Sequence, residues 1–400
     1  MTAQPQSVEF PLDTLRGALS SEFDFVVLTP AYPRSWATGG EFIRTRVQAY
    51  AAAGLTGLVI HYSSAADPAD ADTTEGGVRI FRVPTQLLPG ILELLSTTEA
   101  AVLAHSPVPE LQHMLQDELP GRPLGVWFHG YEVRDTRRLH GNYTTREAAK
   151  LREAHSAVNA TRFEAAGRLF ANPDVTKVFV SDFQRRTSEV DVGEAADNFE
   201  VIPNFIDGEH YAARVRQPEE AGRILLMRGF AQRNYGNDIG LKAIEHLTHR
   251  EGFNDLQFTI RGFGRLFDEE TARVASLPNV DVQKRYSSPA EMAIAHYEHG
   301  IFLCPTRYDT QGVMLGEAMA SGMVCVTTPV AAIPEFTDER SVIFAKPDDP
   351  LAFAEALWYL VHHPEIMPGL SIEAARRVRE QCGHENTVGR ELALIERLRP

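Results

Sequence analysis

The sequence predicts an α/β protein made of two doubly wound parallel-sheet domains that face a central cleft. Its 400 residues exceed the length of one typical hydrophobic core, which favours two domains. Its apolar runs are short and continuous, a pattern typical of strands buried on both faces of a parallel sheet. Helical patterns lie between many of these runs, and such alternation forms right-handed crossover units.

The predicted strands fall into two series. The first comprises residues 23–30, 57–62, 78–84, 100–105, 123–130, 175–181 and 199–204, and the second comprises residues 223–229, 256–262, 279–285, 300–306, 323–328 and 341–346. The clearest helix is expected over 145–170, where Leu151, Val158 and Leu169 belong to an apolar set at helical spacing.

A polar segment, 204–222, separates the two series and is the predicted linker. We therefore expect a first domain over 1–206, a second over 207–375, and a C-terminal helix over 376–400 that packs back toward the first domain. In such folds small ligands bind in the cleft, beside the carboxyl ends of parallel strands.

Composition excludes several classes of protein. A hydrophobic content of 44% and a charged content of 23% are ordinary for a globular protein. The net charge of −15 argues against nucleic acid as a partner, because phosphate binding needs a basic face. No apolar stretch approaches the roughly 18 residues of a membrane span. The polar N-terminus and three scattered cysteines lead us to expect a cytoplasmic protein without disulfides.

One stretch is basic. Residues 134–168 contain eight Lys and Arg against four Asp and Glu. This segment either steers an anionic acceptor or makes peripheral contact with the inner face of a membrane, or it is an ordinary solvated helix face.

Several motifs resemble those of the family 4 glycosyltransferases. The stretch PTRYDTQGVMLGEAMASGMVCVTTPVAAIPEF is similar to the E-x7-E region of that family, and TGGEFIRT, WFHG, VFVSDF, VIPNFIDGEHY, RGFAQRNYG and IRGFG follow the family order. The resemblance covers nearly the whole chain and is strongest from about 200 to 350. It implies the GT-B architecture, in which two Rossmann-like domains bind the acceptor and the nucleotide-sugar donor respectively.

The resemblance implies that two carboxylates contact the donor. Asp309 is expected to accept hydrogen bonds from hexose hydroxyls, and Glu317 suits the ribose diol. Between them a helix begins, and its backbone N–H groups are placed to hold phosphate or sugar oxygens. These groups belong to Gln311, Gly312 and Val313. The chain departs from the family where Asp309 replaces the usual Glu and a Thr-Gln pair replaces Gly-Phe, which changes the reach toward the sugar.

Two arginines are the predicted partners of the diphosphate. Arg228 and Arg233 have the spacing of the family's Arg and Lys, which neutralise the leaving nucleoside diphosphate. Fixed cations stabilise that charge without a metal ion. The alternative is a pair of solvated loop arginines.

Four further residues are candidates. Gly39 and Gly40 allow close backbone approach to a phosphate or sugar. His129 ends a predicted strand and is expected to point into the cleft, toward the donor sugar. Glu335 either contacts the hexose or caps a helix.

The implied function is that of a retaining glycosyltransferase in glycan or polysaccharide synthesis, with a nucleotide-diphospho-sugar donor, a glycan or lipid-linked acceptor and no obligatory metal or other cofactor. Asp70-Ala-Asp72 has the spacing of a metal-binding pair but not its context, so no metal site is predicted. Two alternatives stay open: a sugar-nucleotide epimerase on the same architecture, and a non-catalytic partner subunit that binds a sugar nucleotide.

Overall fold

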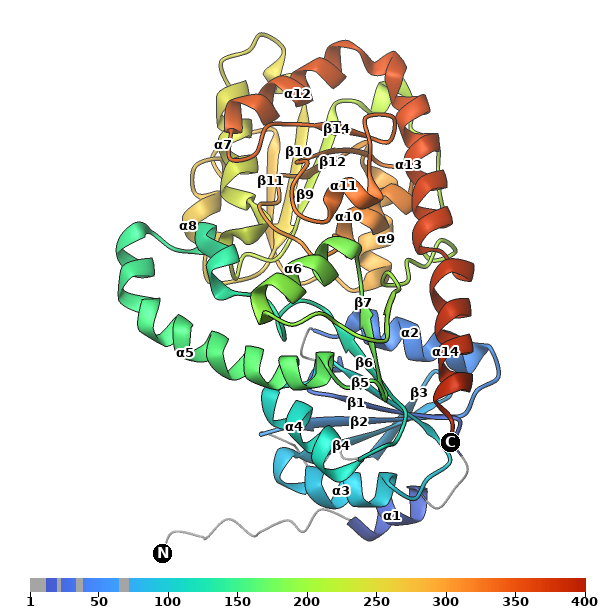
Figure 1. Cartoon of the computed structure of the whole chain (residues 1–400). Helices are drawn as coiled ribbons and strands as arrows, with labels where there is room; N and C mark the ends of the chain where they lie inside the picture. Colours follow the sequence, from blue (N-terminus) through green and yellow to red (C-terminus); the bar gives the residue numbers. More distant parts are fainter. Residues whose placement is uncertain (1–11, 20–22, 34–38, 65–71) are drawn as a thin grey trace, which may run out of the picture.

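The computed structural model describes residues 12–19, 23–33, 39–64 and 72–400. These residues form two α/β domains, each built around one sheet and connected through the segment 202–222 (Figure 1). Asp70 of the Asp-Ala-Asp segment lies outside the described residues.

The first sheet has the strand order β3-β4-β2-β1-β5-β6-β7-β8. Its strands are β1 (Phe25–Thr29), β2 (Gly57–Ser63), β3 (Asp72–Glu75), β4 (Val78–Pro84), β5 (Ala101–His105), β6 (Leu124–Phe128), β7 (Val175–Phe179) and β8 (Phe199–Val201). Its helices are α1 (Leu12–Leu19), α2 (Glu41–Ala52), α3 (Leu88–Leu95), α4 (Pro109–Glu118), α5 (Thr145–Phe170) and α6 (Asp182–Val192), with short 3₁₀ turns η2 (Thr85–Leu87) and η3 (Thr136–Asn142). Every strand pair is parallel except β3 with β4.

The second sheet has the order β11-β10-β9-β12-β13-β14, with all pairs parallel. Its strands are β9 (Arg223–Met227), β10 (Gln257–Gly262), β11 (Val280–Lys284), β12 (Ile301–Cys304), β13 (Val324–Thr327) and β14 (Val342–Phe344). Its helices are α7 (Asn237–Leu247), α8 (Phe267–Thr271), α9 (Pro289–Glu298), α10 (Val313–Ala320), α11 (Ile333–Phe336), α12 (Pro350–His362) and α13 (Met367–Cys382), with 3₁₀ turns η4 (Pro218–Glu220), η5 (Arg233–Tyr235), η6 (Phe253–Asp255) and η7 (Pro364–Ile366).

The inner strands of both sheets are buried on both faces, as the continuous apolar runs predict. In β1, Val26 and Leu28 enter one core cluster, whereas Phe25 and Val27 enter another on the opposite face. The predicted α/β fold class is confirmed, and each predicted run overlaps a strand. The edge strand β3 was not predicted, because its sequence DTTE is polar and carries no apolar pattern.

The C-terminal segment differs from the single helix that the sequence predicts over 376–400. The helix α13 ends at Cys382, a π-helical turn η8 follows over Glu385–Gly389, and α14 occupies Arg390–Leu398. Figure 1 shows α13 beside the second domain and α14 beside the first. Leu394, Ile395 and Leu398 of α14 are buried in the core cluster of the first sheet.

A buried charge pair fixes α14 to the first domain. Arg46 of α2 donates from Nε to Oε1 of Glu391 at 2.7 Å, and both side chains are fully buried. The Tyr50 hydroxyl donates to Oε2 of Glu391 at 2.7 Å, and Trp127 Nε1 donates to Oε1 at 3.3 Å. Every oxygen of this carboxylate is therefore hydrogen-bonded, which offsets the cost of burying the charge.

We predict that Glu391→Ala destabilises the protein by about 3–5 kcal/mol, because it leaves the Arg46 guanidinium buried without its counterion. Urea denaturation measures this loss. The matched control is Glu396→Ala on the exposed face of α14. A loss of less than about 1 kcal/mol for Glu391→Ala, similar to that of an exposed pair, would contradict the prediction.

Candidate functional site

A cavity of about 840 Å³ lies between the two domains. It is lined by residues that directly follow strands of both sheets: Ser106 after β5, His129 after β6, Arg228 after β9, Phe263 after β10 and Arg285 after β11. The carboxyl ends of two parallel sheets therefore meet at one cavity, which is where such folds place small ligands.

One loop after β12, residues 308–312, joins the domains at this cavity. The Ser181 hydroxyl donates to the Thr310 carbonyl at 2.6 Å, and the Thr310 hydroxyl donates to the His129 carbonyl at 2.9 Å. Gln311 Oε1 accepts from both the backbone and the side-chain nitrogen of Asn204 at 2.7 Å, and its Nε2 donates to the Asn204 carbonyl at 3.1 Å.

These hydrogen bonds show the structural role of the Thr310-Gln311 pair in this chain. Gln311 is buried, does not line the cavity, and its side chain is committed to Asn204. Its backbone N–H lies 3.4 Å from Asp309 Oδ1. The pair therefore connects the loop 308–312 to the first domain and the linker. The predicted contact of the Gln311 backbone N–H with a donor stays a prediction.

Asp309 and Arg228 form an ion pair on the cavity wall. Arg228 Nη2 donates to Asp309 Oδ2 at 3.1 Å, and the guanidinium lies 4.4 Å from the centre of the Tyr235 ring. Arg228 is buried, and its Nε makes no hydrogen bond. A rigidly held guanidinium is thus available at the point where the sheet ends and the cavity begins.

Glu317 lies on α10 and lines the same cavity. Burial raises the pKa of Glu317 to about 7; the hydrogen bond from the Tyr211 hydroxyl and the charge of Arg228 oppose the rise, and Glu41 adds to it. The carboxylate is therefore poorly solvated, and ligand hydroxyls that donate to it would replace missing water.

His129 is held from behind by a second histidine. His105 Nδ1 and His129 Nε2 are 3.2 Å apart, and the His105 ring stacks on Trp127 with centroids 4.6 Å apart. Burial, together with the charge of Arg46, lowers the pKa of His129 well below its ordinary value. A neutral His129 therefore faces the cavity at pH 7, as a hydrogen-bonding group rather than a cation.

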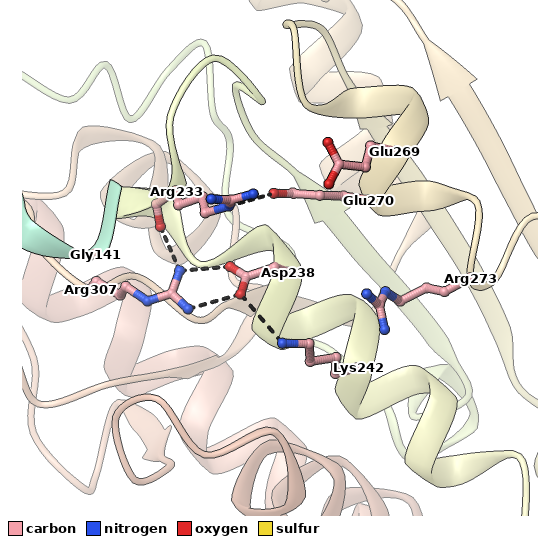
Figure 2. Close-up of a pocket in the computed structure, with 8 residues that line it drawn as sticks. All are labelled: Gly141, Arg233, Asp238, Lys242, Glu269, Glu270, Arg273 and Arg307. Carbon is pink, nitrogen blue, oxygen red and sulfur yellow. Dashed lines mark hydrogen bonds and ion pairs between the residues drawn. The ribbon is translucent and has the colours of Figure 1, made fainter. Parts of the chain in front are cut away.

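Arg233 does not line this cavity, so the structure does not bring its side chain together with Arg228. It belongs to the 3₁₀ turn η5, whose next residues, Asn234 and Tyr235, line the cavity. The Arg233 side chain points to the other side of the turn, into a separate pocket, where its Nε lies 3.6 Å from Glu270 Oε1 (Figure 2).

The glycines take structural roles. Gly40 has φ of 80°, and a Cβ there would lie 2.2 Å from the Ala31 carbonyl oxygen. Gly312 has φ of 91°, and its Cβ would lie 2.8 Å from Ile333 Cδ1. Neither these two glycines nor the exposed Gly39 line the cavity, whereas Val313 does.

Glu335 adopts the second of its two predicted roles. Its Oε2 accepts from the Asp182 backbone N–H at 2.9 Å, and its Oε1 accepts from the Phe183 N–H, at the start of α6. The side chain thus caps a helix of the opposite domain and lies outside the cavity lining.

Several cavity residues were missed by the sequence analysis. The first turn of α2 contributes Glu41, Phe42 and Arg44, and the loop after β11 contributes Tyr286. Tyr286 hydrogen-bonds Glu41 across the cleft, so the two domains meet here as well. Their positions in the sequence could have identified them, because Glu41 directly follows the Gly39-Gly40 pair and Tyr286 directly follows a predicted strand.

The basic stretch 134–168 contains many paired cations. Arg138 binds Asp191 through Nε and Nη2 at 2.6 Å, and Arg168 binds Asp117 at 2.9 Å. The N-terminal half of α5 is exposed along most of its length. Among the described residues, no helix has the length and apolar character of a membrane span, and no group of three or more His, Cys, Asp or Glu is arranged for a metal ion.

Residues 222–363 match the family model described as "Glycosyl transferases group 1". This match spans all strands of the second sheet, from β9 to β14, and α12. No curated protein matches the chain.

Solved structures match almost the whole chain. Sucrose-phosphate synthase from Thermosynechococcus elongatus is 15% identical with a TM-score of 0.72, covering 93% of this chain and 98% of that one. The HepE protein of Anabaena, solved with UDP and glucose, is 11% identical with a TM-score of 0.66, covering 94% and 98%. A UDP-forming trehalose-phosphate synthase from Burkholderia vietnamiensis is 12% identical, with a TM-score of 0.66 over 94% and 98%. These likenesses show the GT-B fold.

We predict that Glu317→Gln stabilises the protein at about pH 8 and leaves its stability unchanged near pH 4.5. The folded-state pKa of about 7 lies above the ordinary 4.5, so the stability linked to this group is complete below pH 4.5 and is lost as pH rises through 7. Gln carries no charge and avoids that loss.

Melting temperatures of both proteins across this pH range measure the effect. The matched control is Glu251→Gln, which alters an exposed carboxylate outside the cavity. Equal melting temperatures for wild type and Glu317→Gln at about pH 8 would contradict a raised pKa for Glu317.

Proposed function

We propose that the chain is a retaining glycosyltransferase that moves a hexose-type sugar from a nucleotide-diphospho-sugar to a glycan or lipid-linked acceptor. The observation that carries the proposal is the convergence of Arg228, Asp309, Glu317 and His129 on one cavity between two GT-B domains. The match of residues 222–363 to a glycosyltransferase family model supports it.

Arg228 is the proposed partner of the diphosphate. As the glycosidic bond breaks, negative charge grows on the leaving phosphate, and a buried guanidinium stabilises that charge strongly because water is excluded. Its Nε is free of hydrogen bonds, and only its Nη2 is committed to Asp309. The ion pair with Asp309 and the Tyr235 ring hold the cation in place before the donor arrives.

Glu317 is the proposed partner of the ribose. Its carboxylate faces the cavity from α10, one helical turn past Val313, and it accepts a hydrogen bond from the Tyr211 hydroxyl. Two vicinal hydroxyls donating to one carboxylate would lower its pKa and relieve its poor solvation.

The sugar is proposed to lie between Asp309 and His129. Asp309 retains acceptor capacity for hexose hydroxyls, and neutral His129 has one ring nitrogen, Nδ1, that finds no partner among the described residues. The acceptor then enters beside the first domain, and the leaving phosphate oxygen takes its proton on the same face of the sugar. This front-face route retains the anomeric configuration and needs no protein nucleophile.

We expect a thermal-shift screen of nucleotide-diphospho-sugars to give one ligand that raises the melting temperature through preferential binding to the folded state. Glu317→Ala should weaken binding of that ligand at least tenfold, about 1.4 kcal/mol, and Glu251→Ala on the surface should not. Unchanged affinity for Glu317→Ala would refute its assignment to the ribose.

NMR spectra of the products formed from the bound nucleotide sugar distinguish a transferase from an epimerase and from a non-catalytic subunit. A transferase releases the nucleoside diphosphate and yields a glycoside, or a hydrolysed sugar, with the donor's initial anomeric configuration. Inversion of a ring hydroxyl without release would indicate an epimerase, and tight binding without turnover would indicate a non-catalytic subunit.

Activity is expected to survive EDTA. In this proposal the charge of the leaving diphosphate is stabilised by Arg228 on the cavity wall and not by a divalent ion. The measurement is nucleoside-diphosphate release with and without chelator. Complete loss that Mg²⁺ or Mn²⁺ restores would contradict the metal-independent mechanism.

A further inference from the structure

A second, charged pocket lies on the far side of η5 from the interdomain cavity. It has a volume of about 330 Å³ and is lined by Gly141 of the first domain and by seven charged residues of the second (Figure 2). The two pockets share no lining residue. The proposed glycosyl transfer therefore uses none of these side chains.

The cations of this pocket are incompletely paired. Arg307 donates from Nη1 and Nη2 to both oxygens of Asp238, at 2.6 and 2.9 Å, so this carboxylate is largely occupied. Lys242 Nζ then lies 3.8 Å from Asp238, and Arg233 Nε lies 3.6 Å from Glu270, both beyond hydrogen-bonding distance. The fourth cation, Arg273, uses Nη1 to bind Glu245 at 2.9 Å.

Figure 2 shows how these groups face one another. Arg233 and Glu270 lie side by side with Glu269 next to them, the Lys242 ammonium is turned toward Asp238, and Arg273 lies on the opposite side. Three cations, from η5, from α7 and from the turn after α8, thus line one small space together with carboxylates. Such an arrangement matches the several oxygens of a phosphate group.

The buried Glu270 adds a second kind of contact. Only 6% of this residue is exposed, and its Oε1 makes no hydrogen bond to any described residue. Burial, and next the charge of Asp238, raises the pKa of Glu270 to about 7. A carboxyl group in this state pairs well with a neutral hydroxyl, which can donate to its charged form and accept from its protonated form.

We propose that this pocket is a second ligand site, which takes a small phosphate monoester that also carries hydroxyl groups. Lys242, Arg273 and Arg233 hold the phosphate, and Glu270 binds a hydroxyl. Because Gly141 belongs to the first domain and the other lining residues to the second, the ligand sits where the domains touch. The adjoining contact is the Asn234 N–H donating to Asn142 Oδ1 at 2.7 Å.

Isothermal titration with glycerol 3-phosphate tests the site. We expect saturable binding to the wild-type protein and at least tenfold weaker binding to the Lys242→Ala/Arg273→Ala variant. The matched control is Arg250→Ala, which removes an exposed arginine paired with Glu355 outside the pocket. A cavity variant, Arg228→Ala, should bind the probe as wild type does.

The role of Glu270 is tested with the same titration. Glu270→Ala should reduce the affinity for glycerol 3-phosphate more than the affinity for inorganic phosphate, because only the former has hydroxyl groups to bind. Equal losses for the two probes would overturn the assignment of Glu270.

Two results would overturn the site itself. One is absence of saturable binding to the wild-type protein; the other is loss of binding in Arg228→Ala with retention in Lys242→Ala/Arg273→Ala, which would place the probe in the interdomain cavity. Binding of the nucleotide sugar to Lys242→Ala/Arg273→Ala should equal that of wild type, so this proposal and the proposed glycosyl transfer can fail separately.

Discussion

The arrangement of the site depends on the hydrogen bonds between the loop 308–312 and the first domain. Thr310 is bound on both sides, by Ser181 and by the His129 carbonyl, and Gln311 is bound by Asn204. These contacts bring the carboxyl ends of two separate sheets to one cavity. They also fix Asp309, the preceding residue, against Arg228.

Two further contacts support this closure from outside the cavity. Glu335 of the second domain caps α6 of the first, and α14 crosses back to the first sheet, where Glu391 is buried with Arg46. Arg46 lies on α2, whose first turn carries Glu41, Phe42 and Arg44 into the cavity. The C-terminal helix therefore positions a wall of the cavity while contributing nothing to its lining.

The ionisable groups that line the cavity are poorly solvated. The raised pKa of Glu317 and the lowered pKa of His129 both follow first from burial. Such groups cost stability in the free protein, and ligand hydroxyls and phosphates that bind them recover part of that cost. The free energy recovered when a ligand binds these groups allows a closed cleft to favour a polar donor over water.

Much of the fold could be predicted because burial on both faces of a sheet leaves a continuous apolar run in the sequence. The strand β3 was not predicted because a polar edge strand has no continuous apolar run. His129 and Arg228 were expected at the cavity because each directly follows a predicted strand, and Asp309 and Glu317 because the motif around them resembles that of a known family; all four line the cavity.

The remaining candidates depended on information that local sequence does not hold. Arg233 follows Arg228 by five residues, but the turn η5 directs its side chain away from the cavity. Gln311 and Glu335 are occupied by Asn204 and by the start of α6, which are more than a hundred residues distant in the chain. Side-chain direction in a turn and partners across a domain boundary become visible only in the folded structure.

The most direct test of the central claim is a crystal structure with the nucleoside diphosphate that binds most tightly among UDP, GDP and ADP. The account predicts the diphosphate within hydrogen-bonding distance of Arg228 and the ribose hydroxyls on Glu317. A nucleotide bound beside Lys242 and Arg273, with the interdomain cavity empty, would contradict it.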